Sequence, residues 1–123
     1  MSTQSVAIVV AYPSTHPETS EPLQFNMSYY LSHHLPLIER VWAPYGLQSW
    51  SINEFQNPCP LTGKTPPYLV QATVYFDTLE NFRIALEKAV AETGPDLENF
   101  SNVQPVVWVG GEKGTGVVEG VVQ

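Results

Sequence analysis

Six segments with a regular hydrophobic pattern follow one another along the 123 residues, and their order constrains the fold more than any other feature. The strand-like segments are continuously apolar, as at 6–12, or alternate between two faces, as at 68–76. The helix-like segments repeat their apolar residues every three to four positions. The pattern predicts strands at 6–12, 47–55, 68–76 and 102–110, and helices at about 26–42 and 77–93.

Both predicted helices carry boundary signals. Asn26 is expected to cap the first helix, and Asp77 followed by Glu80 forms a capping-box pattern at the start of the second. Gly94 and Pro95 are expected to end the second helix, because neither residue continues a helix well. The apolar stripe predicted for this helix consists of Phe82, Ala85, Leu86, Ala89 and Val90.

The order strand, helix, strand, strand, helix, strand predicts an α+β domain with the ferredoxin-like βαββαβ arrangement and a four-stranded antiparallel sheet. Two helices cover only one face of such a sheet. The other face carries Val, Trp, Leu and Tyr side chains, so we expect a homodimer in which a second copy covers it about a two-fold axis. The chain length suits one domain, at 1–112, followed by a glycine-rich tail at 113–123 that could add an edge strand.

Composition excludes several partners and compartments. Twelve acidic and five basic residues give a net charge of −7, and there is no basic cluster that could bind a phosphate backbone, so nucleic acid is not an expected partner. Cys59 is the only cysteine, so no disulfide can form within the chain. No apolar run approaches the roughly 20 residues that span a bilayer, and the N-terminus lacks a basic region. We therefore expect a cytoplasmic protein that binds no membrane.

The first predicted helix contains two adjacent histidines and a proline, in the segment YYLSHHLPLIERVWAPYG. On a helical wheel His34 lies within the apolar stripe, whereas His33 lies roughly 100° away, near the solvent edge. Pro36 cannot donate a hydrogen bond to the carbonyl of Ser32, so we expect a bend or a restart that opens space beside His34. Alternatively, His34 is a core histidine bonded to the backbone, and Pro36 simply begins a second helix.

The segment FNMSYYLSHHLPLIERVWAPYG resembles the signature of the EthD family, which has an aromatic residue, Asp or Asn, two tyrosines, three residues and then His-x-Pro-Leu. The similarity continues through PPYLVQATVYFDTLENF and LENFSNVQPVVWVG, and so covers the chain up to about Glu112. The resemblance implies a dimeric α+β barrel, in agreement with the predicted order of elements. It places His34, and not His33, at the family's histidine position, with Tyr30 one turn earlier. Asn26 stands where many relatives have Asp.

His34 and Tyr30 are the candidate catalytic residues. A neutral imidazole in an apolar pocket is a general acid or base near pH 7, and the Tyr30 hydroxyl could bond the imidazole or a substrate oxygen. Burial is expected to lower the pKa of His34, and a neighbouring carboxylate would oppose that shift. Aromatic side chains could line a pocket for a small hydrophobic, aromatic or carbonyl compound. The candidates for that pocket are Tyr12, Tyr29, Trp50, Tyr68, Tyr75 and Trp108.

The resemblance leaves the reaction open, because fungal relatives resemble decarboxylases and dehydratases of aromatic polyketide pathways and the wider superfamily includes lactone isomerases. One hypothesis is a cofactor-independent lyase or isomerase in which His34 moves a proton. The other is a non-catalytic dimeric protein that binds a small apolar ligand. A metal site is not expected, since His33 and His34 diverge on the helix and Cys59 stands alone. Haem binding is not excluded by the sequence, because other branches of the superfamily bind haem. His34 would then be the single axial ligand of the iron.

Overall fold

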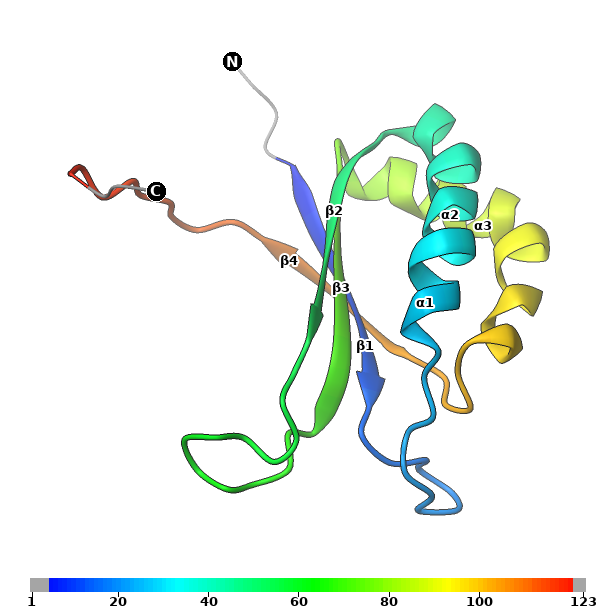
Figure 1. Cartoon of the computed structure of the whole chain (residues 1–123). Coiled ribbons are helices and arrows are strands. Elements are labelled where there is room, and N and C mark those ends of the chain that lie inside the picture. The colour runs from blue at the N-terminus through cyan, green and yellow to red at the C-terminus, as the bar shows by residue number, and fades with distance from the viewer. Residues whose placement is uncertain (1–4, 121–123) are drawn as a thin grey trace.

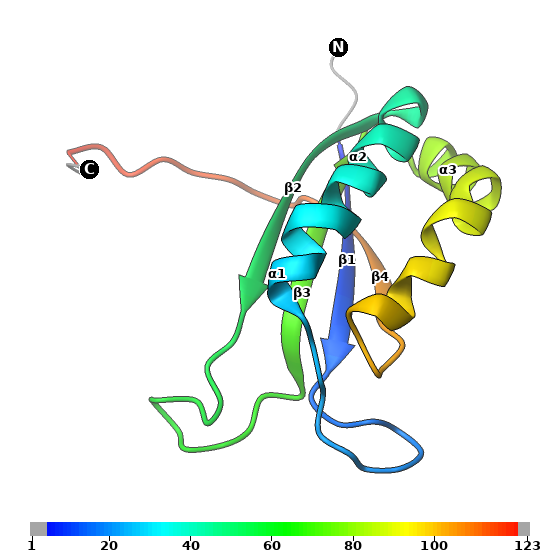
Figure 2. The ribbon, with the colours of Figure 1, turned by 45° about the vertical axis from the view of Figure 1, so that its right-hand side comes forward.

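The computed structural model describes residues 5–120 as one four-stranded antiparallel sheet with helices on a single face (Figures 1 and 2). The spatial order β2-β3-β1-β4, antiparallel at every pairing, is that of the ferredoxin-like arrangement, so the predicted fold class is confirmed. The strands are β1 (Val6–Pro13), β2 (Leu47–Glu54), β3 (Tyr68–Phe76) and β4 (Val106–Gly111).

The first helical region, residues 27–45, is one continuous run of four helical segments. Asn26 caps it as predicted, because its Oδ1 accepts a hydrogen bond from the backbone N–H of Tyr29 at 3.0 Å. Gly46 ends the region at φ 114°, where a Cβ atom would collide with the carboxylate of Asp77. The segments are α1 (Met27–Tyr29), a π-helical turn (Tyr30–His34), α2 (Leu35–Trp42) and a 3₁₀ turn (Ala43–Tyr45).

The second helical region contains α3 (Leu79–Thr93) and a 3₁₀ turn (Pro95–Asn99). Its cap is Thr78, whose hydroxyl accepts from the backbone N–H of Asn81 at 3.0 Å, so the prediction that Asp77 caps this helix is wrong by one residue. Asp77 instead accepts hydrogen bonds from the backbone N–H of Thr78 and from the side chain of Asn81. Of the predicted apolar stripe, Phe82, Ala85 and Ala89 are buried, whereas Leu86 and Val90 are 40% and 56% exposed.

The two faces of the sheet differ as the alternation in β3 predicts. Val74 and Phe76 are buried beneath the helices, together with Ile8 of β1. Val9, the next residue of β1, points to the opposite face and is paired with Trp108 of β4, which is 60% exposed. No helix formed by residues 5–120 covers that face (Figure 1).

After β4 the chain leaves the sheet, as both ribbon views show. Residues 112–120 form no strand, and Val117 and Val118 are exposed. The edge strand considered for the tail is therefore not formed within its described part, and Val121 and Val122 lie outside the described residues. Within residues 5–120, no helix has both the length and the apolar character needed to cross a membrane.

Candidate active site

A wide turn of the first helical region positions the two histidines. Tyr30–His34 is π-helical, because the backbone N–H of Leu35 donates to the carbonyl of Tyr30, five residues earlier. Leu35 stays helical at φ −64° and ψ −42°, although it precedes Pro36. The expected break is thus a local widening of a continuous helix, which moves the preceding carbonyls away from the proline ring. The widened turn buries His34 and leaves His33 exposed, as the helical wheel predicts.

His34 is paired with a carboxylate from a distant part of the sequence. Its Nδ1 lies 2.9 Å from Oδ2 of Asp96, which belongs to the turn after α3 and is 62 residues further along the chain. Since an ionised carboxylate only accepts hydrogen bonds, Nδ1 of His34 carries the proton and donates it. Nε2 is then unprotonated in the neutral ring and is the atom that can act as a base.

Hydrogen bonds from several groups hold Asp96 in its ionised form. The Tyr29 hydroxyl donates to Oδ1 at 2.5 Å, and Nδ2 of Asn99 donates to the same oxygen at 3.0 Å. Burial raises the pKa of Asp96, but the hydrogen bonds from Tyr29, Asn99 and His34 outweigh burial, so the pKa is below its usual value. The carboxylate is therefore charged at neutral pH and can stabilise a proton on the imidazole.

The imidazole of His34 packs against two aromatic rings and is neutral near pH 7. The Tyr30 ring stacks on it with centroids 5.4 Å apart, and the Phe100 ring lies 4.5 Å away on a tilted plane. Burial lowers the pKa of His34 from its ordinary 6.5, and the hydrogen bond and charge of Asp96 only partly oppose that shift. The site thus supplies an oriented, uncharged imidazole whose protonated form has a carboxylate partner.

A cavity of about 190 Å³ lies between the helices and the sheet, with His34 in its wall. Ile38 and Trp42 follow His34 along the same side of the helical region and also line the cavity. Leu86 of α3 and Val107 of β4 line it too and are 40% and 47% exposed, so the cavity opens to solvent between these two elements. Four larger depressions elsewhere on the described surface include neither His34 nor its partner Asp96.

The two predicted catalytic residues have different surroundings. His34 lines the cavity, whereas Tyr30 lies behind it, packed on the imidazole, and is not among the lining residues. Burial raises the pKa of Tyr30 to about 12, and a hydrogen bond with Tyr12 opposes that rise. Tyr30 is therefore a protonated phenol in the aromatic cluster that supports His34.

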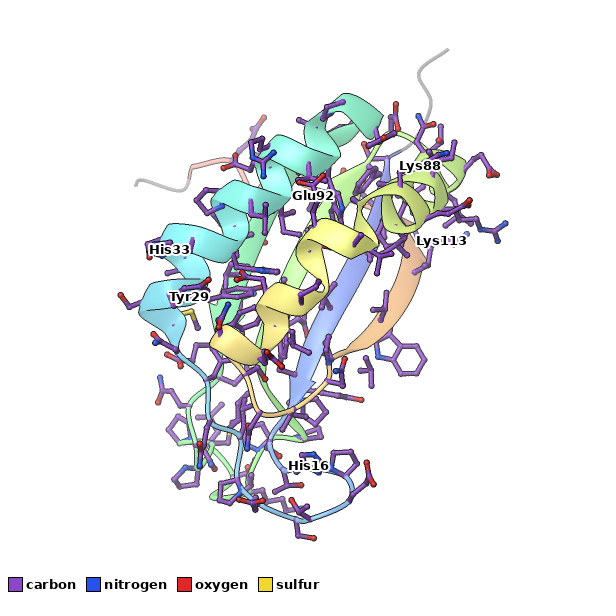
Figure 3. All side chains as sticks on the ribbon, turned by 90° about the vertical axis from the view of Figure 1, so that its right-hand side faces the viewer. His16, Tyr29, His33, Lys88, Glu92 and Lys113 are labelled. Atoms are coloured by element: carbon purple, nitrogen blue, oxygen red, sulfur yellow. The ribbon has the colours of Figure 1, made fainter. Side chains whose placement is uncertain are left out.

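Of the six aromatic residues predicted to form a pocket, Tyr12 alone lines this cavity. Tyr29 bonds Asp96 from the more exposed side of the helix, where Figure 3 shows it next to His33. The other four lie on the strands away from the cavity. Trp50 packs at the margin of the core, Tyr68 begins β3 opposite Pro13, and Tyr75 and Trp108 occupy the uncovered face.

The sequence analysis missed two residues that shape the site, Asp96 and Trp42. Asp96 follows the helix-ending Gly94 and Pro95, a position where an aspartate reads as an ordinary turn residue. Trp42 follows His34 by eight residues on one helix, so the helical wheel could have placed both on one side. No group of three or more His, Cys, Asp or Glu side chains that could hold a metal ion occurs among residues 5–120.

Comparison with known proteins identifies relatives at the level of sequence family and of fold. The family model described as EthD domain matches residues 18–104. No curated protein sequence matches the chain. An EthD-like protein from Ralstonia eutropha JMP134 superposes with a TM-score of 0.73 at 20% identity, over 88% of this chain and 91% of that protein. An ethyl tert-butyl ether D (EthD) family protein from Bacillus halodurans C-125 superposes with a TM-score of 0.61 at 18% identity, over 89% of this chain and 99% of that protein. A protein of unknown function from Nitrosomonas europaea superposes with a TM-score of 0.55 at 10% identity, over 98% of this chain and 100% of that protein.

Proposed function

The chain belongs to the EthD domain family, and we propose that it is a cofactor-independent lyase or isomerase in which His34 moves a proton of a small hydrophobic compound. One observation carries the proposal: a buried imidazole, bonded through Nδ1 to Asp96, lies in the wall of a cavity that opens to solvent. A base needs access to its substrate, a pKa near the working pH and a partner for the charge it acquires. His34 has a feature that serves each of these needs.

The proposed reaction uses Nε2 of His34, the imidazole nitrogen that is not bonded to Asp96. Nε2 of His34 takes a proton from a carbon next to a carbonyl, and the electron pair of the C–H bond moves toward the carbonyl oxygen. The imidazolium formed is stabilised by the carboxylate of Asp96, 2.9 Å from Nδ1. Returning the proton to another carbon gives an isomerase, and expelling a leaving group from the neighbouring carbon gives a lyase. General base catalysis of this kind typically contributes about 10²–10⁴-fold in rate.

Cavity size limits the substrate. The volume is about 190 Å³, and an apolar cavity of about 150 Å³ holds one benzene molecule. A single small ring or a short branched chain fits, whereas a fused polycyclic compound does not. The apolar side chains of Ile38 and Leu86 in the wall favour a hydrophobic body for this ligand.

A direct test is proton exchange at carbon in deuterated water. Small cyclic ketones are incubated with the protein, deuterium incorporation next to the carbonyl is followed by NMR, and conversion of cyclohex-3-enone to its conjugated isomer is followed by ultraviolet absorption. We expect both rates to exceed those of His34→Ala protein, and His33→Ala is the matched control. Equal rates with the parent and His34→Ala proteins, for ketones that NMR shows to be bound, would exclude the proposal.

A binding protein without turnover is the second candidate. The hydrogen bond between His34 and Asp96 also ties the first helical region to the turn after α3, which is a structural role that needs no chemistry. In that case His34→Ala lowers ligand affinity or stability, and the exchange rates with the parent protein equal those in buffer. Measuring affinity and exchange on the same samples separates the two functions.

We also propose that the uncovered face of the sheet is closed by a second copy of the chain. Trp108 is 60% exposed there beside Val9, and an apolar sheet face of this kind is rarely left in water. Sedimentation analysis is expected to give a dimer for the parent chain and a monomer for Trp108→Glu. Leu61→Glu, at a residue 92% exposed in a loop, is the control that should stay dimeric. A monomeric parent chain would contradict this part of the proposal.

A further inference from the structure

The indole N–H of Trp42 has no hydrogen-bond acceptor among residues 5–120. Trp42 is 7% exposed, and its Nε1 is the only buried side-chain nitrogen or oxygen within that range for which no partner is found. Buried donors are nearly always bonded, because removal from water without a replacement acceptor costs free energy. The orphaned donor is therefore a feature that requires a physical explanation.

Trp42 lies in the wall of the cavity that contains His34. The two residues are separated by Ile38, and all three line the cavity from one side of the helical region. Eight residues of helix correspond to about 12 Å along the axis. Both side chains lean toward the helix N-terminus, and the indole, which is the longer of the two, reaches further along the cavity in the direction of His34. A ligand of one small ring can then lie between the imidazole and the indole.

The side chains around Trp42 provide no good hydrogen-bond acceptor for its indole N–H. The ring of Phe82 is nearly perpendicular to the indole, with centroids 5.9 Å apart, and an aromatic face is only a weak acceptor. Phe76 lies 5.7 Å away on a tilted plane. The hydroxyl of Thr93, another residue of the cavity wall, donates to the carbonyl of Ala89 at 3.2 Å. An indole N–H only donates, so its missing partner must be an acceptor.

We propose that Nε1–H of Trp42 binds an oxygen acceptor of the ligand, so that the cavity takes a small cyclic ketone or a similar oxygen-bearing ring in preference to a hydrocarbon. This inference rests on the proposed function for the use of the cavity as the ligand site. If the acceptor is the carbonyl of the reacting compound, the N–H stabilises the negative charge that builds on that oxygen as His34 takes the proton.

The test compares two probes of nearly the same shape, cyclohexanone and methylenecyclohexane, which differ by an oxygen in place of a CH₂ group. Each is titrated into ¹⁵N-labelled protein, and the indole N–H signals of the three tryptophans are followed by NMR. Trp42→Phe assigns the Trp42 signal. If that variant fails to fold, Trp50→Phe and Trp108→Phe assign it by elimination. We expect the Trp42 signal to move downfield with the ketone and not with the alkene.

Affinities measured on the same proteins complete the test. Trp42→Phe is expected to weaken cyclohexanone binding roughly three- to tenfold more than methylenecyclohexane binding, as the loss of one hydrogen bond predicts. A Trp42 signal that responds equally to both probes, or to neither, would overturn the inference. Failure here is separable from failure of the proposed function, because the loss of exchange in His34→Ala protein tests the base itself, whichever group binds the substrate oxygen.

Discussion

Two tyrosine–histidine pairs lie on one helical region, and comparing them shows which surroundings suit a histidine to act as a general base. Tyr29 stacks on His33 at 4.7 Å, and Tyr30 stacks on His34 at 5.4 Å, each pair with the same four-residue spacing. His33 is exposed, and its Nδ1 lies 2.9 Å from the hydroxyl of the exposed Ser32. His34 is buried and bonded to a carboxylate. Residue type and spacing are equal, so burial and the partner group set the difference.

Asp96 is hydrogen-bonded to one member of each pair, and the two hydrogen bonds have different effects. One carboxylate oxygen accepts from the hydroxyl of Tyr29, and the other accepts from Nδ1 of His34. On the Tyr29 side the bond helps to keep the carboxylate ionised and raises the pKa of the Tyr29 hydroxyl. On the His34 side it orients the ring and leaves Nε2 free. The predictions below test whether the inner pair alone carries function.

Removing each imidazole is expected to give the largest difference. His34→Ala should lower the ketone exchange rate by about 10²–10⁴-fold, because it deletes the general base. His33→Ala, one residue away on the exposed side, should stay within about threefold of the parent protein, which is small beside that general-base contribution. Exchange measured by NMR in deuterated water checks both. Comparable losses of exchange rate in the two variants would contradict the distinction between the histidines, since the exposed His33 would then contribute as much to exchange as His34.

Replacing the shared carboxylate is expected to have the next largest effect. Asp96→Asn removes the charge that stabilises the imidazolium, and a hydrogen bond to a charged group is worth about 1.5–3 kcal/mol, or roughly 10- to 100-fold in rate. Because Asp96 raises the pKa of His34 against burial, the variant should lower that pKa further. NMR titration of the His34 ring follows the change. A pKa of His34 that stays the same or rises in Asp96→Asn would contradict the role assigned to the carboxylate.

The inner histidine should also make stability depend on pH. The folded-state pKa of His34 is below its unfolded value of 6.5, so the unfolded chain binds the proton first as the pH falls. The contribution is fully present above about pH 6.5 and is lost below it, at up to about 1.4 kcal/mol per pH unit. Urea unfolding between pH 7.5 and 5 is expected to show a shallower loss for His34→Gln, with His33→Gln as the control for the exposed side. A slope unchanged by His34→Gln would exclude this linkage.

The difference between the two sides of the helix could be predicted from the sequence only in part. Helical periodicity places His34 inward and His33 outward, and Asn26 caps the helix as its residue type indicates. Periodicity carries no signal for the π-helical turn, because one backbone hydrogen bond to the fifth residue hardly alters the apolar pattern.

The contact of His34 with Asp96 joins residues 62 positions apart and depends on how the two helical regions pack. Local pattern therefore cannot reveal it. The strands show the same limit: Tyr75 and Trp108 alternate as predicted, but the alternation does not say which of the two faces borders a cavity.

The smallest expected effect separates the rings of the two tyrosines from their hydroxyls. Tyr30→Phe keeps the stack on His34 and removes a buried hydroxyl near Tyr12, so it should cost about 1 kcal/mol in the free energy of unfolding. Tyr29→Phe removes a half-exposed bond to Asp96 and should cost less. If Tyr30 acts only by positioning the imidazole, exchange by Tyr30→Phe stays near the parent rate, whereas Tyr30→Ala lowers it. A large loss of exchange in Tyr30→Phe with unchanged stability would instead give the Tyr30 hydroxyl a part in the chemistry, and the inner pair would then act through both of its members.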